Sequence, residues 1–157
     1  MESWNQTSTD AVRTHAPGGV NKRIDERVER CVRYMAEQER SEISRYLGRL
    51  EREWDSTRAV LVAGSALAVA GLWLGRRSGG RWRILGGVAA GLMLQHGLLG
   101  FGPLAELVRA LGGVRTRREI DLEKFALKAL RGDFERIPKP DGGPLARANA
   151  ALVAAQS

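Results

Sequence analysis

Two apolar segments, Ala59–Gly75 and Ile84–Gly102, constrain the fold most strongly because neither contains a charged residue. About 20 apolar residues in a helix cross the hydrocarbon core of a bilayer, and the first segment is slightly shorter than this. The polar connector Arg76–Arg83 is long enough for a tight reversal and little else. Backbone polar groups in lipid must be satisfied within a helix. We therefore predict an all-α protein built on a two-span transmembrane helical hairpin.

Residues suited to the boundary between lipid and water stand at the ends of both segments. An arginine can lay its apolar stem along a helix while its charge stays in water, and tryptophan is enriched at the same depth. These properties make up for the short first segment. The expected interfacial anchors are Trp54, Arg58, Trp73, Arg76, Arg77, Trp82 and Arg83.

The net charge of +7 and the pI near 10.5 invite a nucleic-acid interpretation, so the position of the charge matters. Basic and acidic residues alternate from Lys22 to Arg58, which leaves that region close to neutral. The surplus of arginine lies beside the apolar segments, as expected of a protein held against anionic lipid headgroups. No base-stacking or groove-reading motif accompanies it. The sequence therefore predicts a lipid bilayer as partner and no nucleic acid.

The rival interpretation is that both segments are buried helices of a soluble bundle. Such helices keep polar residues on at least one face. Ala59–Gly75 has no such face, and its content of glycine and alanine is high for a well-filled soluble core. The pattern favours the membrane.

Small residues recur at four-residue spacing in both segments, which lets helix backbones approach closely. Because lipid offers no hydrophobic drive for helix association, close packing is one of the few forces available. We expect self-association. The predicted oligomer interface consists of Gly64, Ala68, Gly86, Gly87, Ala90, Gly91, Gln95 and His96.

The pair Gln95-His96 is unusual because polar groups at membrane depth are costly and generally face a partner. One interpretation is an interhelical hydrogen bond that fixes the register of a dimer. Another is that His96 is an axial ligand to a haem or chlorophyll-type pigment. Conduction of protons or substrate, and a histidine that only extends to the interface, also remain open. His15, the other histidine, lies in the leader, so we predict no metal site.

No catalytic constellation is found on a credible scaffold, and we predict that the chain is not an enzyme. Cys31 is the only cysteine, which excludes an internal disulfide and a multi-thiol metal site. It is better explained as a small apolar residue on a helix face than as a redox centre.

The remaining regions are read from periodicity and turn signals. After a disordered leader over residues 1–19, which lacks a signal peptide, residues 20–57 form an amphipathic region. This region is two helices or one bent helix, capped by Asn21 and weakest at Gln38–Ser41. Residues 58–103 are the hairpin. Residues 104–134 contain a short interfacial helix and, after a capping box at Thr116, a second helix. Residues 135–157 are a linker and an Ala-rich tail with one marginal helix.

The chain resembles the YgaP-like family of small inner-membrane proteins of unknown function, specifically its longer members with an amphipathic amino-terminal region. The resemblance covers about His15 to Phe134. Four blocks carry it: Val20-Asn21-Lys22-Arg23-Ile24, Leu50-Glu51-Arg52-Glu53-Trp54-Asp55, Leu94-Gln95-His96, and Arg115-Thr116-Arg117-Arg118-Glu119-Ile120 continuing through Ala126–Phe134.

This resemblance implies a multi-pass protein of the bacterial inner membrane, a homodimer with both termini and their helices in the cytoplasm. Some relatives add a rhodanese domain that transfers sulfur through a cysteine, and this chain has none. The family often has a cysteine before the proline that ends the second span, where this chain has Gly102 and Pro103. That departure argues against a sulfur relay.

The function expected from the sequence is that of a non-catalytic oligomeric scaffold, or an accessory subunit of a larger membrane complex. The alternative is a cofactor-binding or sulfur-handling membrane protein that uses His96.

Overall fold

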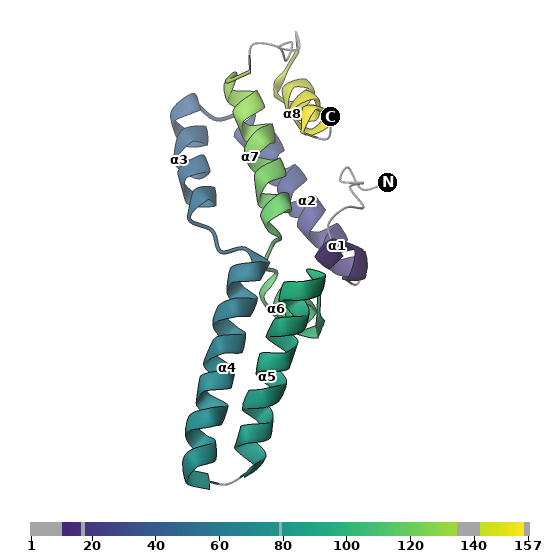
Figure 1. Ribbon diagram of the computed structural model, residues 1–157. Helices are drawn as coiled ribbons and strands as arrows, with labels where there is room; N and C mark the ends of the chain where they lie inside the picture. Colours follow the sequence, from purple (N-terminus) through teal and green to yellow (C-terminus); the bar gives the residue numbers. More distant parts are fainter. Residues whose placement is uncertain (1–10, 17, 79, 135–141, 156–157) are drawn as a thin grey trace. The chain divides into compact units, whose positions relative to one another are not determined.

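The computed structural model describes residues 11–16, 18–78, 80–134 and 142–155, and it has no strand in these ranges. The all-α prediction is confirmed. The helices form two compact units, a helical bundle of α2, α3, α7 and α8 and a hairpin unit of α1, α4, α5 and α6 (Figure 1). The helices are α1 Ala11–His15, α2 Gly18–Met35, α3 Arg40–Glu51, α4 Ser56–Ser78, α5 Gly80–Leu99, α6 Pro103–Gly112, α7 Arg117–Arg131 and α8 Pro144–Ala154.

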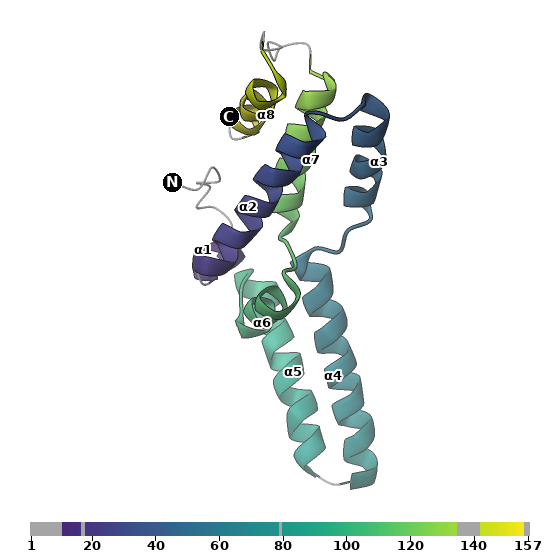
Figure 2. The same cartoon turned by 180° about the vertical axis from the view of Figure 1, so that it is seen from behind.

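The helical bundle is organised around α7, which contacts α2, α3 and α8 (Figure 2). Apolar residues three or four positions apart, such as Ile43, Leu47 and Leu50, line one face of each helix. Burying these faces together supplies the main stabilisation, at about 1.5–3 kcal/mol for each large side chain. The shared core includes Val28, Val32, Met35, Ile43, Leu47, Leu50, Ile120, Leu127, Ala148, Ala151 and Leu152.

Residues 20–57 contain two helices in the bundle and not one bent helix. α2 ends at Met35 and α3 begins at Arg40, so the break falls at the predicted weak point. The expected cap was wrong, because α2 begins at Gly18 and Asn21 lies inside its first turn. The earlier start places Val20 on the same buried face as the apolar residues that follow it.

The Ala-rich tail is part of the bundle. α8 buries Ala148, Ala151 and Leu152 in the shared core. The guanidinium of Arg147 donates a hydrogen bond to the carbonyl of Ala36, at 2.9 Å, just beyond the end of α2. Small alanines allow α8 to lie close to its neighbours, which explains why a helix that looks marginal in isolation is stable here. Of the predicted linker, residues 135–141 lie outside the described residues.

In the hairpin unit, α4 and α5 lie side by side and run antiparallel (Figure 1). Both are longer at the reversal than predicted, since α4 continues to Ser78 and α5 begins at Gly80. The expected polar connector Arg76–Arg83 is therefore mostly helical. Arginine has a high helix propensity, so the basic residues extend the two helices and do not interrupt them.

The helix of the second apolar segment ends at Leu99, three residues before the predicted end of the span at Gly102. Gly100 has a φ of 74°, a left-handed conformation that glycine adopts without steric cost. α6 then starts at Pro103, whose fixed φ suits a first helical position. The predicted helix after Pro103 is confirmed, and its axis is bent by 95° from that of α5.

The structure corrects the prediction of a disordered leader in the part that it describes. α1 contacts α6, and Val12 is buried with Leu104 and Ala105. The ring of His15 stacks on Phe101 with centroids 3.9 Å apart. These contacts are with residues distant in the sequence, which is why local composition did not indicate them. Residues 1–10 lie outside the described residues.

The bundle core generates a stability prediction. Leu127 on α7 is fully buried, so Leu127→Ala is expected to destabilise the bundle by about 2–5 kcal/mol through lost burial and a residual cavity. Leu145→Ala on α8 is the matched control, since this leucine is exposed. Thermal unfolding of the purified chain in detergent measures both. Equal melting temperatures for the two variants would contradict the assigned core.

Candidate functional site

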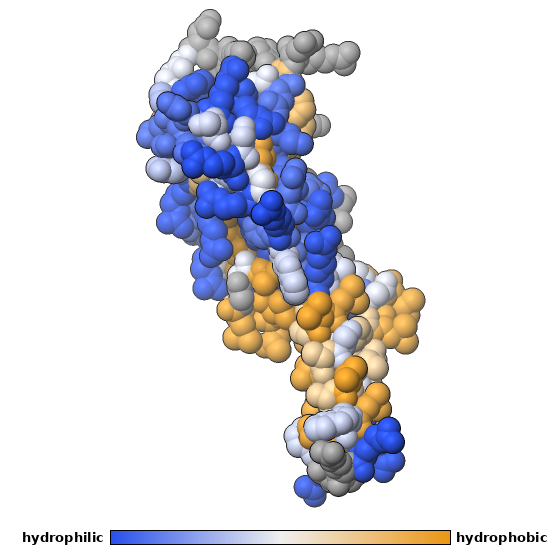
Figure 3. All heavy atoms as spheres, turned by 90° about the vertical axis from the view of Figure 1, so that its left-hand side faces the viewer, coloured by the Kyte–Doolittle hydropathy of each residue, from blue (hydrophilic) through white to orange (hydrophobic). Residues whose placement is uncertain are grey.

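Large apolar side chains cover the outer faces of α4 and α5. In Figure 3 they form a broad hydrophobic surface that gives way to hydrophilic residues at the tip of the hairpin. Soluble monomers rarely expose contiguous apolar patches of more than a few hundred Å². The large apolar residues exposed on these two helices are Leu61, Val62, Leu67, Val69, Leu72, Trp73, Trp82, Ile84, Leu85, Val88, Leu94, Leu98 and Leu99.

One of these two helices is long and apolar enough by itself to cross a membrane, and the other is so only together with α6. The stretch Arg40–Arg76, whose apolar part is α4, is long and apolar enough, and only 22% of its apolar window is buried. α5 meets the requirement together with α6, across the 95° bend. The described residues thus contain one candidate span, or two if the bent pair is one span.

Glycines fill the inner face of the hairpin, where the two backbones are in contact. A Cβ atom added at Gly71 would lie 2.6 Å from the backbone nitrogen of Gly86. At Gly64 an added Cβ would lie 2.4 Å from Cγ of Met93, and at Gly86 it would lie 3.1 Å from the carbonyl oxygen of Ala68. No larger residue fits at Gly71 without displacing backbone.

Three of the eight predicted interface residues therefore have a place inside the hairpin, namely Gly64, Ala68 and Gly86. Gly87, Ala90 and Gly91 are exposed on α5. A Cβ added at Gly87 or Gly91 would meet no atom within 4 Å. The small residues thus divide into an inner set that holds α4 and α5 together and an outer set that is open.

Gln95 and His96 lie in the last turn of α5 before the break. His96 is only 5% exposed, and its Nδ1 atom has no hydrogen-bond partner among the described residues. The amide of Gln95 is half-buried near Gly102, where an added Cβ would lie 3.9 Å from Nε2. His96 is thus directed into the fold, while only Gln95 is partly accessible from outside.

A metal or cofactor at His96 would require further ligands. No group of three or more histidine, cysteine, aspartate or glutamate side chains able to hold a metal occurs in the described part of the chain. A lone imidazole with a buried nitrogen can serve as one axial ligand or donate and accept single hydrogen bonds. Cys31 is half-buried and packs against the bundle core, in agreement with its assignment as a small apolar residue.

The predicted anchors lie near the two ends of α4 and at the start of α5. Trp54, Trp73 and Trp82 are all exposed. Arg58, Arg76 and Arg83 are exposed as well, whereas the side chain of Arg77 lies outside the described residues. Exposed aromatic and arginine side chains therefore lie at the two ends of the apolar surface, and their role as membrane anchors stays a prediction.

Sequence reasoning missed two features of the hairpin. Gly71 and Gly75 belong to the inner face and have the same four-residue spacing as Gly64 and Ala68, so the same signal could have identified them. Asp55 begins α4 by accepting a hydrogen bond from the backbone N–H of Arg58 at 2.8 Å. An aspartate three residues before that N–H is a recognisable helix cap.

In the bundle, charged side chains are paired with one another. The ion pairs along the helices and at the end of α7 include Lys22–Glu26, Arg33–Glu29, Arg45–Glu42, Arg117–Asp121 and Arg131–Asp133. Most join positions three or four residues apart, which are neighbours on a helix surface. The charge of the bundle is thus largely compensated within the bundle itself.

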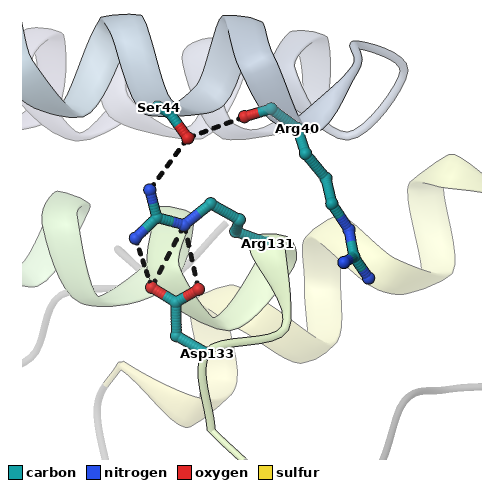
Figure 4. Close-up of polar contacts among 4 residues, drawn as sticks. All are labelled: Arg40, Ser44, Arg131 and Asp133. Carbon is teal, nitrogen blue, oxygen red and sulfur yellow. Dashed lines mark hydrogen bonds and ion pairs between the residues drawn. The ribbon is translucent and has the colours of Figure 1, made fainter.

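The pair Arg131–Asp133 also connects α7 to α3 (Figure 4). Gly132, with a φ of 88°, ends α7 and turns the chain so that the carboxylate of Asp133 accepts a hydrogen bond from Nε of Arg131 at 2.9 Å. Nη1 of Arg131 donates to Oγ of Ser44, also at 2.9 Å. The hydrogen bond and charge of Arg131 lower the pKa of Asp133, and the pKa of Arg131 is raised by the same hydrogen bond.

Comparison with protein-family models, with curated proteins and with solved structures gives no match for this chain. The resemblance to the YgaP-like family therefore stays a prediction.

The packing of the hairpin predicts that substitution by alanine destabilises the chain at a glycine of the inner face and not at an open glycine. Gly71→Ala is expected to lower the melting temperature of the chain in detergent, because its Cβ would overlap the backbone of Gly86. Gly97→Ala on α5 is the control. It adds the same methyl group to open space and gains helix propensity of up to about 1 kcal/mol. A Gly71→Ala variant as stable as Gly97→Ala would refute the close contact.

The lowered pKa of Asp133 predicts a pH dependence. A carboxylate whose pKa is lower in the folded state stabilises the fold above its unfolded pKa, about 3.9, and loses this effect as the pH falls through the folded value. Asp133→Asn should therefore cost less than about 1 kcal/mol at pH 7, since the pair is partly exposed to solvent. The difference from wild type should disappear at lower pH. Thermal unfolding across pH 7 to 2 tests this, and in an Arg131→Gln background Asp133→Asn should have little further effect.

Proposed function

We propose that this chain is a non-catalytic membrane protein whose α4–α5 hairpin is embedded in the bilayer and whose helical bundle docks other proteins in an aqueous compartment. The single observation that carries the proposal is the outward orientation of the large apolar side chains of α4 and α5. Because glycines occupy much of the inner face, few large apolar side chains of α4 and α5 are buried in the hairpin. Lipid tails are the solvent in which such an arrangement is stable.

The dimensions of the two helices agree with this proposal. α4 has 23 residues and α5 has 20, which at a rise of about 1.5 Å per residue gives lengths of about 34 and 30 Å. The hydrocarbon core of a bilayer is about 30 Å thick. The arginines extend α4 and α5 beyond the charge-free segments, so the charges can reach the headgroups while the apolar residues stay in the core.

The right-angled bend before α6 supports an interfacial position for that helix. Leu104 and Ala105 are buried in the hairpin unit, whereas Leu107 and Leu111 are exposed. A short amphipathic helix that leaves its span at about a right angle can rest in the headgroup region with its apolar side toward the tails. In this arrangement α6 and Trp54 lie in one interface, and the tip of the hairpin lies in the other.

A scaffold or accessory-subunit role follows from what the bundle and the hairpin each offer. The bundle presents a hydrophilic surface of alternating charges, and the open small-residue face of Gly87, Ala90 and Gly91 offers close approach to a second helix. We extend the proposal to a homodimer formed through this face in the bacterial inner membrane, with both termini in the cytoplasm as the family resemblance implies. Gly64 and Gly86 are not part of that interface, because they are used inside the hairpin.

A second candidate function is cofactor binding at His96, which the unpartnered Nδ1 atom favours. A buried polar atom without a hydrogen bond costs about 1–3 kcal/mol, so its presence asks for an explanation. An axial ligand role would supply one.

The proposal predicts that the tip of the hairpin and the bundle lie on opposite sides of the membrane. In a Cys31→Ser background, Gly80→Cys places a thiol at an exposed position at the tip and Ser41→Cys places one on the exposed face of α3. A membrane-impermeant maleimide should label Ser41→Cys only from the cytoplasmic side and Gly80→Cys only from the other. The protein should also stay in the membrane pellet in alkaline carbonate.

Labelling of both positions from one side would show that the hairpin does not cross, and release by carbonate would show that it is not embedded. Purification in mild detergent separates the two candidate functions. The scaffold predicts a colourless protein. An absorbance band that is lost in His96→Ala would favour the cofactor site.

A further inference from the structure

The tip of the hairpin is a cluster of basic residues that face no carboxylate among the described residues. Arg76 at the end of α4 and Arg81 and Arg83 at the start of α5 are all exposed. None of the three makes a hydrogen bond or an ion pair with another residue in the part of the chain that the structure describes. No acidic residue occurs in the sequence between Asp55 and Glu106. The tip therefore differs from the bundle, where arginines face carboxylates.

The packing of the tip holds one arginine against the neighbouring helix. A Cβ atom added at Gly75 would lie 2.4 Å from Cγ of Arg83, so the apolar stem of Arg83 lies across the bare backbone of α4. Gly75 is the residue that makes this position possible. A stem fixed on an apolar surface leaves the guanidinium with fewer conformations to lose when it binds an anion.

The chemistry of the tip favours phosphate. All the basic residues of the connector are arginine and none is lysine. Guanidinium groups bind phosphate oxygens through paired hydrogen bonds, whereas an ammonium group acts as a point charge. Trp73 precedes the arginines and Trp82 lies between Arg81 and Arg83. Both are exposed and have amphipathic rings of the kind found at headgroup depth.

We propose that the tip of the hairpin binds the phosphate groups of anionic phospholipids in the leaflet that it reaches. This inference rests on the proposed membrane location and names the ligand of one end of the hairpin. Anionic headgroups supply the negative charge that the chain itself lacks over this region. They also allow four arginines to be placed at a membrane surface without the mutual repulsion that they would otherwise have.

Quenching of tryptophan fluorescence measures whether the tip prefers anionic to zwitterionic phospholipids. In the full chain, Trp4→Phe and Trp54→Phe leave Trp73 and Trp82, next to the tip, as the reporters. The protein is reconstituted in phosphatidylcholine with either brominated phosphatidylglycerol or brominated phosphatidylcholine, and the ratio of quenching gives the relative association of the two lipids. We expect a preference for phosphatidylglycerol of at least about five-fold, the factor that one basic residue contributes at an anionic surface.

Two variants of equal charge identify the residues responsible. Replacement of Arg76, Arg77, Arg81 and Arg83 by glutamine should bring the preference close to one. The matched control replaces four arginines of the bundle that are exposed, Arg23, Arg27, Arg30 and Arg52, and should keep the preference of the parent. Replacement of the four tip arginines by lysine should retain only part of it, because the paired hydrogen bonds are lost.

Each outcome has a defined meaning. A parent ratio close to one, or an unchanged ratio in the glutamine variant, would overturn lipid binding at the tip. Should the glutamine variant not fold, the parent alone still tests the proposal, since its preference must decline as salt is raised from 50 to 500 mM if phosphate binding is electrostatic. Quenching by neither brominated lipid would instead contradict the proposed membrane location, so the two failures are distinguishable.

Discussion

At Gly71 and Gly86 the backbones of α4 and α5 are so close that a methyl group cannot be placed between them. The contact is made by backbone atoms, and the larger side chains of both helices must therefore point away from it. Leucine, valine and tryptophan residues consequently form the outer surface of the hairpin and not a core. Water would make this arrangement unfavourable, at about 25 cal/mol for each Å² of exposed apolar surface, and lipid would not. The proposed membrane location rests on this exposure of the large apolar side chains.

The two units of the chain differ in how their charged side chains are compensated. In the bundle, ion pairs at helical spacing and the contact of Arg131 with Asp133 and Ser44 balance charges locally. In the hairpin, no acidic residue is available and the arginines at the tip remain uncompensated within the described residues. The first arrangement suits an aqueous surface that contacts other proteins. The second suits a surface that is itself negatively charged.

Local signals in the sequence predicted a large part of the fold. The helical class, the helix that begins after Pro103, and the start of α7 after Thr116 all follow from periodicity, proline and capping chemistry, which act within a few residues. α1 and α8 were underestimated because each is stabilised by distant contacts, those of Val12 with Leu104 and of Ala148 with the bundle core. Of the candidate site, the sequence located the exposed tryptophans and arginines and the small residues, but not the division of the small residues between two faces.

The sequence by itself determined where the apolar segments lie, which residues flank them, and where the charge is concentrated, because these depend only on composition along the chain. The tertiary structure decided which side of each helix meets its neighbour. Gly86 and Gly87 are adjacent in sequence and identical in chemistry, yet one is buried against α4 and the other is open. Successive residues in a helix are about 100° apart, so neighbours point in different directions. Only the position of the second helix determines which of them becomes the contact and which remains available for a partner.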